Sequence, residues 1–126
     1  NELRRDGLIT SRWNMLHPEE TPRQSFVEEC LEGAKGPVVA STDYMKSYAD
    51  QIREFISGTY TVLGTDGFGR SDTRERLRHF FEVDRYFIVV AALTALVEDN
   101  VVDVGQVAAA IKKFGIDPEK VNPALS

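Results

Sequence analysis

The fold is decided by residues 37–65, which read PVVASTDYMKSYADQIREFISGTYTVLGT. Two short runs, 37–42 and 60–65, are rich in residues that favour strands, and the apolar residues of the segment between them, 44–56, recur at helical spacing. A strand, a helix and a second strand with short joints predict a βαβ unit, in which the strands lie parallel with a right-handed crossover. Both strands are apolar rather than alternating, which is typical of parallel strands covered on both faces. The sequence therefore predicts the α/β class.

Helices are predicted on both sides of this unit. Towards the N-terminus we expect a weakly amphipathic helix over residues 2–16 and a shorter helix over 24–31, whose apolar face includes Cys30. Towards the C-terminus, three helix starts are predicted from aspartates that stand before apolar-periodic runs: Asp72 with Glu75, Asp84 alone, and Asp103 with Gln106. A parallel pair of strands is normally part of a larger sheet. We therefore expect a mostly parallel sheet flanked by helices, with its first strands missing from this chain.

The composition describes one ordinary domain. The 126 residues are 42% hydrophobic and 28% charged, which leaves no room for two domains. Twenty acidic and 15 basic residues give a net charge of −5, which argues against binding to nucleic acid or to an anionic membrane. We expect no membrane span and no secretory leader, and the lone Cys30 fits a reducing compartment. Because the chain opens at Asn1 without Met, we expect residues 1–126 to be a single partial domain of a larger subunit.

Polar residues follow both predicted strands. Ligands of open parallel sheets bind beyond the carboxyl ends of the strands, so these residues should be neighbours. They form a candidate domain-interface loop made of Ser41, Thr42, Asp43, Asp66, Phe68, Arg70 and Ser71. The sequence favours a simpler alternative, in which Thr42 and Asp43 cap one helix, Ser71 and Asp72 cap the next, and the glycines turn the chain. The aromatic Phe68 between two glycines supports the interface interpretation.

Other candidate sites have weaker signals. The glycine-rich stretch 64–69 has neither the Gly-Lys-Ser/Thr of a P-loop nor the order of a dinucleotide-binding loop. Arg70, Arg74 and Arg78 share one helical stripe, with His79 beside them, and could meet an anionic partner. Nearby carboxylates favour an ordinary solvated helix face instead. Neither histidine of the chain has a second His, Cys or carboxylate at ligand spacing. From the residues alone, we predict no catalytic, cofactor-binding or metal-binding residue.

Four long strings in the chain resemble a single enzyme family. They read RWNMLHPEETPR (12–23), GPVVASTDYMK (36–46), LGTDGFGRSD (63–72) and KFGIDPEKVNP (113–123). Together they are similar to the homodimeric bacterial pyruvate dehydrogenase first component, the decarboxylating subunit that depends on thiamine diphosphate. The DGFGRS loop also resembles the Asp-x-Phe-Gly-x-Ser loop of the related transketolase C-terminal domain. Strings of this length are highly specific, and the resemblance covers essentially the whole chain.

The resemblance implies a transketolase C-terminal-domain-like fold, with its first strands upstream of this chain. It also implies that the intact enzyme, a cytoplasmic homodimer linked to glycolysis, uses thiamine diphosphate and magnesium to decarboxylate pyruvate. That enzyme then acetylates lipoyl groups together with the dihydrolipoyl acetyltransferase component. The family's cofactor motif begins Gly-Asp-Gly and ends in Asn, unlike Thr65-Asp66-Gly67. We therefore expect this chain to bind neither cofactor and to have a structural, dimer-supporting role. The alternative is a free-standing, non-enzymatic protein-interaction module.

Overall fold

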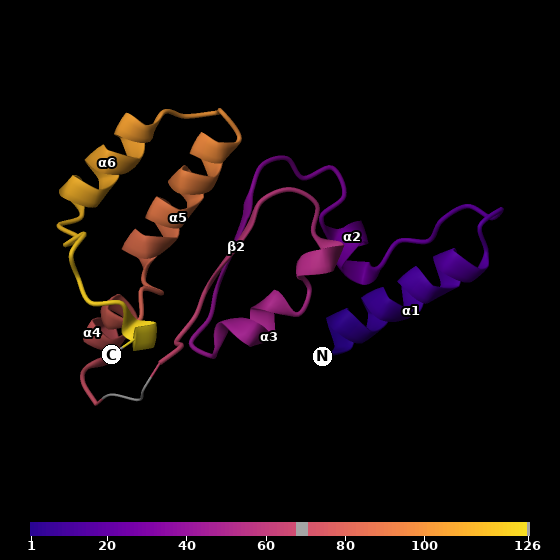
Figure 1. Cartoon of the computed structure of the whole chain (residues 1–126), viewed down its shortest axis with the longest axis horizontal. Coiled ribbons are helices and arrows are strands. Elements are labelled where there is room, and N and C mark those ends of the chain that lie inside the picture. The colour runs from indigo at the N-terminus through magenta and orange to yellow at the C-terminus, as the bar shows by residue number, and fades with distance from the viewer. Residues whose placement is uncertain (68–70, 126) are drawn as a thin grey trace.

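Helices surround a small parallel sheet in the computed structural model, which describes residues 1–67 and 71–125 (Figure 1). The sheet consists of β1 (Val38–Ser41) and β2 (Tyr60–Leu63). The remaining elements are α1 (Glu2–Leu16), α2 (Phe26–Cys30), α3 (Lys46–Asp50), the 3₁₀ turn η1 (Arg53–Phe55), α4 (Arg74–Phe80), α5 (Arg85–Glu98), α6 (Val104–Lys113) and the 3₁₀ turn η2 (Pro123–Leu125). The predicted α/β class is confirmed. No helix within the described residues is long and apolar enough to cross a membrane.

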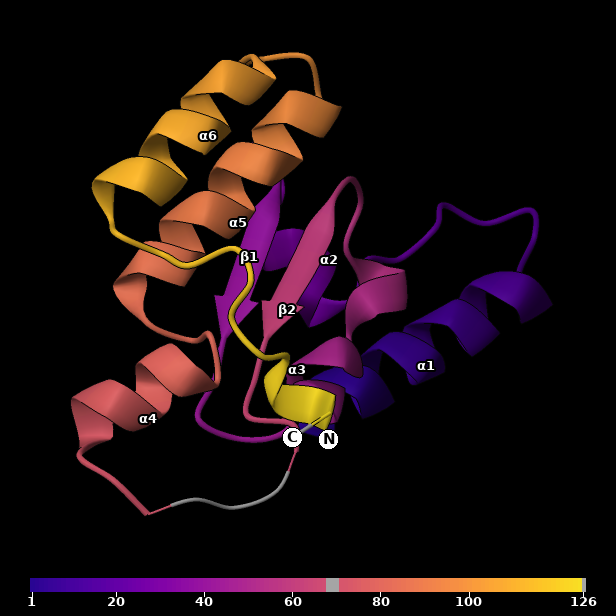
Figure 2. The same cartoon turned by 60° about the vertical axis from the view of Figure 1, so that its left-hand side comes forward.

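The two strands pair in parallel, as the sequence predicts. The register aligns Val38 with Tyr60 and continues to the end of each strand. One further bond extends the pairing, because the Thr42 backbone N–H donates to the Leu63 carbonyl at 3.0 Å. Helix α5 contacts both strands and α3 contacts β2, and Figure 2 shows α5 and α6 side by side next to the sheet. Tyr60 and Val62 of β2 are buried where these helices cover the sheet.

The crossover between the strands is broken, although the spacing predicts one helix over 44–56. Helix α3 ends at Asp50, and a separate 3₁₀ turn carries Phe55 into the interior, where it is 7% exposed. There the Phe55 ring lies against Gly7 of α1, so closely that a Cβ on Gly7 would overlap it. Tyr44 and Met45, predicted on the inner face, precede the helix and are exposed. The prediction of a continuous helix is wrong because a contact with a distant helix sets the position of Phe55.

A stack of side chains closes the C-terminal end of α1. The His17 ring stacks on Trp13 with 4.1 Å between ring centroids, and the guanidinium carbon of Arg23 lies 3.6 Å from the Trp13 centroid. The Asn14 amide donates to the Arg23 carbonyl at 2.9 Å, and the Arg23 backbone N–H donates to Asn14 Oδ1 at 2.8 Å. Helix α1 therefore ends before Pro18, as predicted, and the following loop returns along it.

Helix α2 is shorter than predicted and buries less of its apolar face. It begins after Ser25, whose hydroxyl accepts from the Glu28 backbone N–H while the Glu28 carboxylate accepts from the Ser25 N–H. Val27 is buried, but Phe26 and Cys30 are exposed. The expectation that Cys30 packs on an inner face is wrong, because a helix of five residues that packs against α1 has only one covered side.

Side-chain caps start the three C-terminal helices. Asp84 Oδ1 accepts from the backbone N–H groups of Tyr86 and Phe87, at 3.1 Å each, which confirms the predicted start of α5. The predicted capping box of Asp103 and Gln106 at α6 is also confirmed. The predicted start of α4 is wrong, because Thr73 rather than Asp72 has the extended conformation of a cap, and its hydroxyl accepts from the Arg76 N–H.

The buried core connects these elements through few side chains. The hydrophobic residues buried in the described part of the chain come from α2, the crossover, β2, the loop before α5, and the two helices of the C-terminal hairpin: Val27, Phe55, Tyr60, Val62, Val83, Ala95 and Val107. Helices α5 and α6 pack against each other, which explains the burial of Ala95 and Val107. The carboxyl ends of β1 and β2 lie outside this core, at the edge that faces α4.

Candidate functional site

The segments that follow the two strands are joined by hydrogen bonds, so that the structure brings them together. The Thr65 backbone N–H donates to the Tyr44 carbonyl at 2.9 Å. The Thr65 hydroxyl donates to the Asp43 carbonyl at 2.8 Å. Gly64 allows this approach, because a Cβ there would lie 2.7 Å from the Lys46 backbone nitrogen. We refer to residues 42–46 and 63–66, joined in this way, as the strand-end lock.

Asp66 is the central carboxylate of the strand-end lock. Its Oδ1 accepts from the Lys46 backbone N–H at 3.0 Å, at the first residue of α3. The residue before α3, Met45, makes no side-chain cap, and the Thr42 hydroxyl instead accepts from the Tyr44 N–H at 3.0 Å. The alternative in which Thr42 and Asp43 cap this helix is therefore wrong. The Asp66 carboxylate, from the segment after β2, instead accepts a hydrogen bond from a backbone N–H at the start of α3.

Two further contacts connect the end of β1 and the strand-end lock to the region of α4. Arg78 donates to Asp43 Oδ2 at 3.2 Å, and the two side chains remain 43% and 64% exposed. The Ser41 hydroxyl donates to the Val83 carbonyl at 3.0 Å. An ion pair this exposed contributes at most about 1 kcal/mol. The contacts therefore orient α4 against the sheet more than they stabilise the fold.

The remaining members of the predicted interface loop are not brought into this lock. Ser71 is exposed, and no hydrogen bond within residues 1–67 and 71–125 joins it to the other candidate residues. Phe68 and Arg70 lie outside the described residues. Of the predicted set, the structure thus joins Thr42, Asp43 and Asp66, while Ser41 is turned towards Val83. An interface function of this loop stays a prediction.

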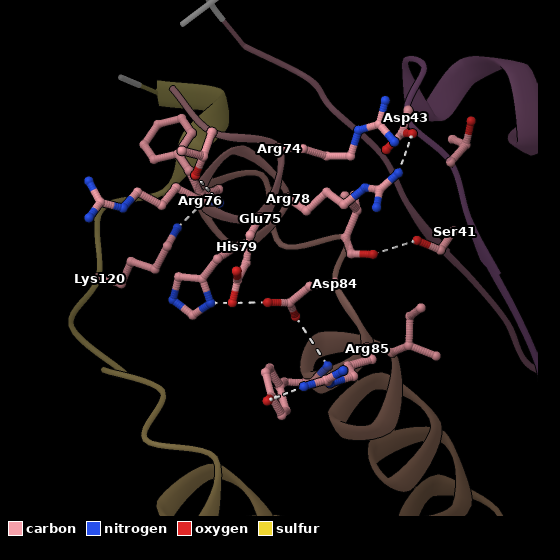
Figure 3. Close-up of a pocket in the computed structure, with 16 residues that line it drawn as sticks. Ser41, Asp43, Arg74, Glu75, Arg76, Arg78, His79, Asp84, Arg85 and Lys120 are labelled. Atoms are coloured by element: carbon pink, nitrogen blue, oxygen red, sulfur yellow. Dashed lines mark hydrogen bonds and ion pairs between the residues drawn. The ribbon is translucent and has the colours of Figure 1, made fainter. Parts of the chain in front are cut away.

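A broad cleft opens between the strand-end lock, α4 and the start of α5 (Figure 3). Its volume is about 1490 Å³. The charged side chains that line it come from the loop after β1, from α4, from the start of α5 and from the segment after α6: Asp43, Arg74, Glu75, Arg76, Arg78, Asp84, Arg85 and Lys120. Figure 3 shows His79 and Asp84 between the Asp43 end and the Lys120 end of this lining. The arginine stripe of α4, which the sequence indicates as a solvated face, therefore forms one wall of a cleft.

Asp84 and His79 form a fixed pair in the cleft wall. His79 Nδ1 lies 3.2 Å from Asp84 Oδ2, while Asp84 Oδ1 caps α5, so both carboxylate oxygens are engaged. The His79 ring also packs against Phe87, with 5.3 Å between centroids. The hydroxyls of Ser41 and Thr73, which line the same cleft, are hydrogen-bonded to backbone groups. No hydrogen bond among the described residues joins His79 to a hydroxyl group, so the arrangement fits binding better than nucleophilic catalysis.

Lys120 and Arg85 complete the cleft, and sequence reasoning missed both. Lys120 Nζ donates to the Phe80 carbonyl at 2.7 Å and to Glu82 Oε1 at 3.4 Å, which ties the C-terminal segment to α4. Arg85 donates to the Tyr86 hydroxyl at 2.8 Å, and this hydrogen bond raises the pKa of Arg85. The only sequence signal for Arg85 is its place next to the capping Asp84.

The strand ends do not fit the diphosphate and magnesium that the resemblance implies for the intact enzyme. Asp66 Oδ1 accepts from a helix N–H, and the Thr65 hydroxyl donates to a carbonyl. A Cβ on Gly67 would overlap the Pro123 carbonyl, so the chain is already in close contact there. Within the described residues, no three His, Cys, Asp or Glu side chains are grouped to hold a metal ion. We derive no catalytic step from these residues.

The chain is similar to proteins of one family. Residues 2–84 match the family model described as the transketolase-like TK C-terminal domain. The chain is 64% identical over 124 residues to the pyruvate dehydrogenase E1 component of Pseudomonas aeruginosa, covering 98% of this chain and 14% of that protein.

Two further relatives carry the same name. They are the proteins of Cupriavidus necator, 58% identical over 122 residues, and of Escherichia coli K12, 56% identical over 126 residues. The matches cover 97% and 99% of this chain, and the chain spans only 14% of the length of each relative. Since the family model covers more than half of the 126 residues, the chain belongs to the family of transketolase-like C-terminal domains.

Proposed function

We propose that this chain is the C-terminal part of the decarboxylating first component of a pyruvate dehydrogenase complex, and that its role there is structural. The observation that carries the proposal is 64% identity over 98% of the chain to a protein named pyruvate dehydrogenase E1 component. Identity this high, without any large unmatched segment, supports a common function as well as a common fold. The chain is accordingly a single partial domain of that subunit.

The activity of the whole subunit follows from this assignment. The intact enzyme is a cytoplasmic homodimer that decarboxylates pyruvate and acetylates the lipoyl groups of the dihydrolipoyl acetyltransferase component. Thiamine diphosphate, held with magnesium, supplies the carbanion stabilisation that decarboxylation needs. The residues that hold this cofactor belong to other parts of the subunit, since the strand ends described here do not fit it.

The contribution of this chain is to present a rigid strand-end lock to a neighbouring domain. The backbone groups of the lock bond to one another, so it needs no partner to become ordered. Next to it, Tyr44, Met45 and Tyr48 are 71%, 56% and 61% exposed, and the two tyrosine rings contact each other edge to face. Exposed aromatic residues on an ordered support are typical of protein–protein contacts.

The test compares the full-length polypeptide that contains this sequence with the 126-residue chain alone. Each is assayed for release of carbon dioxide from pyruvate with thiamine diphosphate and magnesium. We expect turnover by the full-length protein and none by the chain, with circular dichroism as the check that the chain is helical. A full-length protein without pyruvate turnover would refute the assignment, and turnover by the chain would refute its structural role.

A further inference from the structure

The cleft beside α4 carries the opposite charge to the chain as a whole. Five cations and three carboxylates line it, although the net charge of the chain is −5. Arg74, Arg76 and Arg78 come from α4, Arg85 from α5, and Lys120 from the segment after α6. A positive cleft on an acidic protein attracts anionic groups.

Ion pairs within the chain neutralise only part of this positive charge. Arg78 is paired with Asp43, Lys120 is paired with Glu82, and Arg76 lies 3.9 Å from Asp72. Arg74 and Arg85 have no carboxylate within 4.0 Å anywhere in residues 1–67 and 71–125. Both are exposed. Arg85 donates one hydrogen bond to the Tyr86 hydroxyl and is in no ion pair within the described residues. Guanidinium groups recognise carboxylates through paired, planar hydrogen bonds.

The carboxylates of the cleft are already neutralised or held by the protein. Asp84 gives one oxygen to the start of α5 and the other to His79, and Asp43 accepts from Arg78. Glu75 alone lacks an ion-pair partner among the described residues, and it lies on the same helix as Arg74. In the described part of the chain, an incoming carboxylate therefore meets two cations outside ion pairs on separate helices, Arg74 and the Tyr86-bonded Arg85, and one carboxylate outside an ion pair.

The size and lining of the cleft match a peptide better than a small anion. A volume of about 1490 Å³ far exceeds that of a phosphate ion. The lining also includes apolar side chains, of which Val83 is 6% exposed and Ile88 of α5 is half-buried. Glu75 and the acidic remainder of the chain oppose a polyphosphate backbone.

We propose that this cleft binds an acidic peptide segment of a partner protein, with carboxylates on Arg74 and Arg85 and an apolar side chain against Ile88. The proposal goes beyond the structural role above, because it gives the cleft its own ligand class. It does not depend on the identity of the enzyme. Failure of the pyruvate assay would leave it standing, and failure of peptide binding would leave the assignment of the subunit standing.

Fluorescence anisotropy of a labelled peptide with alternating Glu and Leu residues tests the proposal on the full chain. The test variant is the double charge reversal R74E/R85E. The matched control is R4E/R12E, which changes the net charge equally on α1, a helix that Figure 1 shows at the opposite end of the chain's structure from α4. We expect R74E/R85E to weaken binding by about ten-fold or more and R4E/R12E to change it less than about two-fold, since two short-range ion pairs are each worth up to several-fold. Circular dichroism confirms that both variants fold.

Three results would overturn the proposal. The first is absence of binding by the unmodified chain, and the second is equal weakening by both double variants, which would mean that only net charge matters. The third is displacement of the peptide by inorganic phosphate or by a single-stranded oligonucleotide at concentrations as low as those of unlabelled peptide. That outcome would assign the cleft to a phosphate-bearing ligand instead.

Discussion

Replacing Gly7 with Ala decides whether the contact between α1 and the crossover is as tight as the structure shows. Two effects oppose each other. Alanine in the middle of a helix is favoured over glycine by about 1 kcal/mol. The new methyl group would overlap three atoms of the Phe55 ring, which is buried and cannot swing into solvent. Overpacking of this kind costs about 1–3 kcal/mol. We therefore expect G7A to lower the free energy of unfolding by about 1 kcal/mol.

Urea denaturation followed by far-UV circular dichroism measures this difference. S11A, at an exposed position of the same helix, is the matched control, and it should raise the stability slightly through helix propensity alone. Combining G7A with F55L should restore part of the loss, because the smaller side chain leaves room for the methyl group. An increase of about 1 kcal/mol for G7A alone would show that the Phe55 ring does not press on α1, and would refute the reasoning.

Two further predictions concern single side chains. D84A removes both cap bonds of α5 and the partner of His79, so it should destabilise the chain by about 1–2 kcal/mol in urea denaturation. D84N keeps an acceptor and should therefore cost less. Equal stability of D84A and the parent would contradict the role of Asp84 as a cap. Burial raises the pKa of Tyr60, whose hydroxyl donates to the Ala49 carbonyl at 2.7 Å, so its contribution is fully present below the unfolded pKa of about 10 and is lost as the pH rises through the folded value. The stability difference between the parent and Y60F should therefore be constant below pH 10 and shrink above it, and a constant difference at all pH values would contradict the shift.

Local patterns in the sequence were sufficient for the sheet and for most helix starts. The βαβ unit is predicted from two β-rich runs on either side of a segment with helical spacing. The structure confirms both strands, because each is defined by residues that are neighbours in the sequence. The caps at Asp84 and Asp103 follow from a side chain that reaches backbone N–H groups two or three residues later. The start of α4 could not be resolved in this way, because Asp72 and Thr73 are adjacent and both can cap.

The contacts that define the site join residues far apart in the sequence, which explains what was missed. Asp66 caps a helix that starts twenty residues earlier, and Lys120 reaches the carbonyl of Phe80 across forty residues. The crossover breaks because Phe55 has to reach Gly7. The sequence does place the two strand ends together, since parallel strands end at the same edge. The sequence contains no local signal that shows which side chain after one strand would hydrogen-bond to the segment after the other strand.

The positive charge of the cleft also depends on contacts between residues far apart in the sequence. The arginine stripe of α4 is visible in the sequence, and nearby carboxylates make it look neutralised. In the structure, Asp84 is occupied by the start of α5 and by His79, and Arg85 adds a cation from another helix. The balance of charge at a surface depends on which groups are already engaged, and only the tertiary structure contains that information.

The central claim is that the strand-end lock supports the assembly of the subunit without taking part in its chemistry. Its most direct test is the D66A variant of the full-length protein, with E54A, an exposed carboxylate of the same crossover, as the control. We expect D66A to shift dimer dissociation, measured by sedimentation, to higher protein concentration, while kcat per remaining dimer stays unchanged and E54A behaves like the parent. A loss of kcat in D66A with the dimer intact would contradict this account.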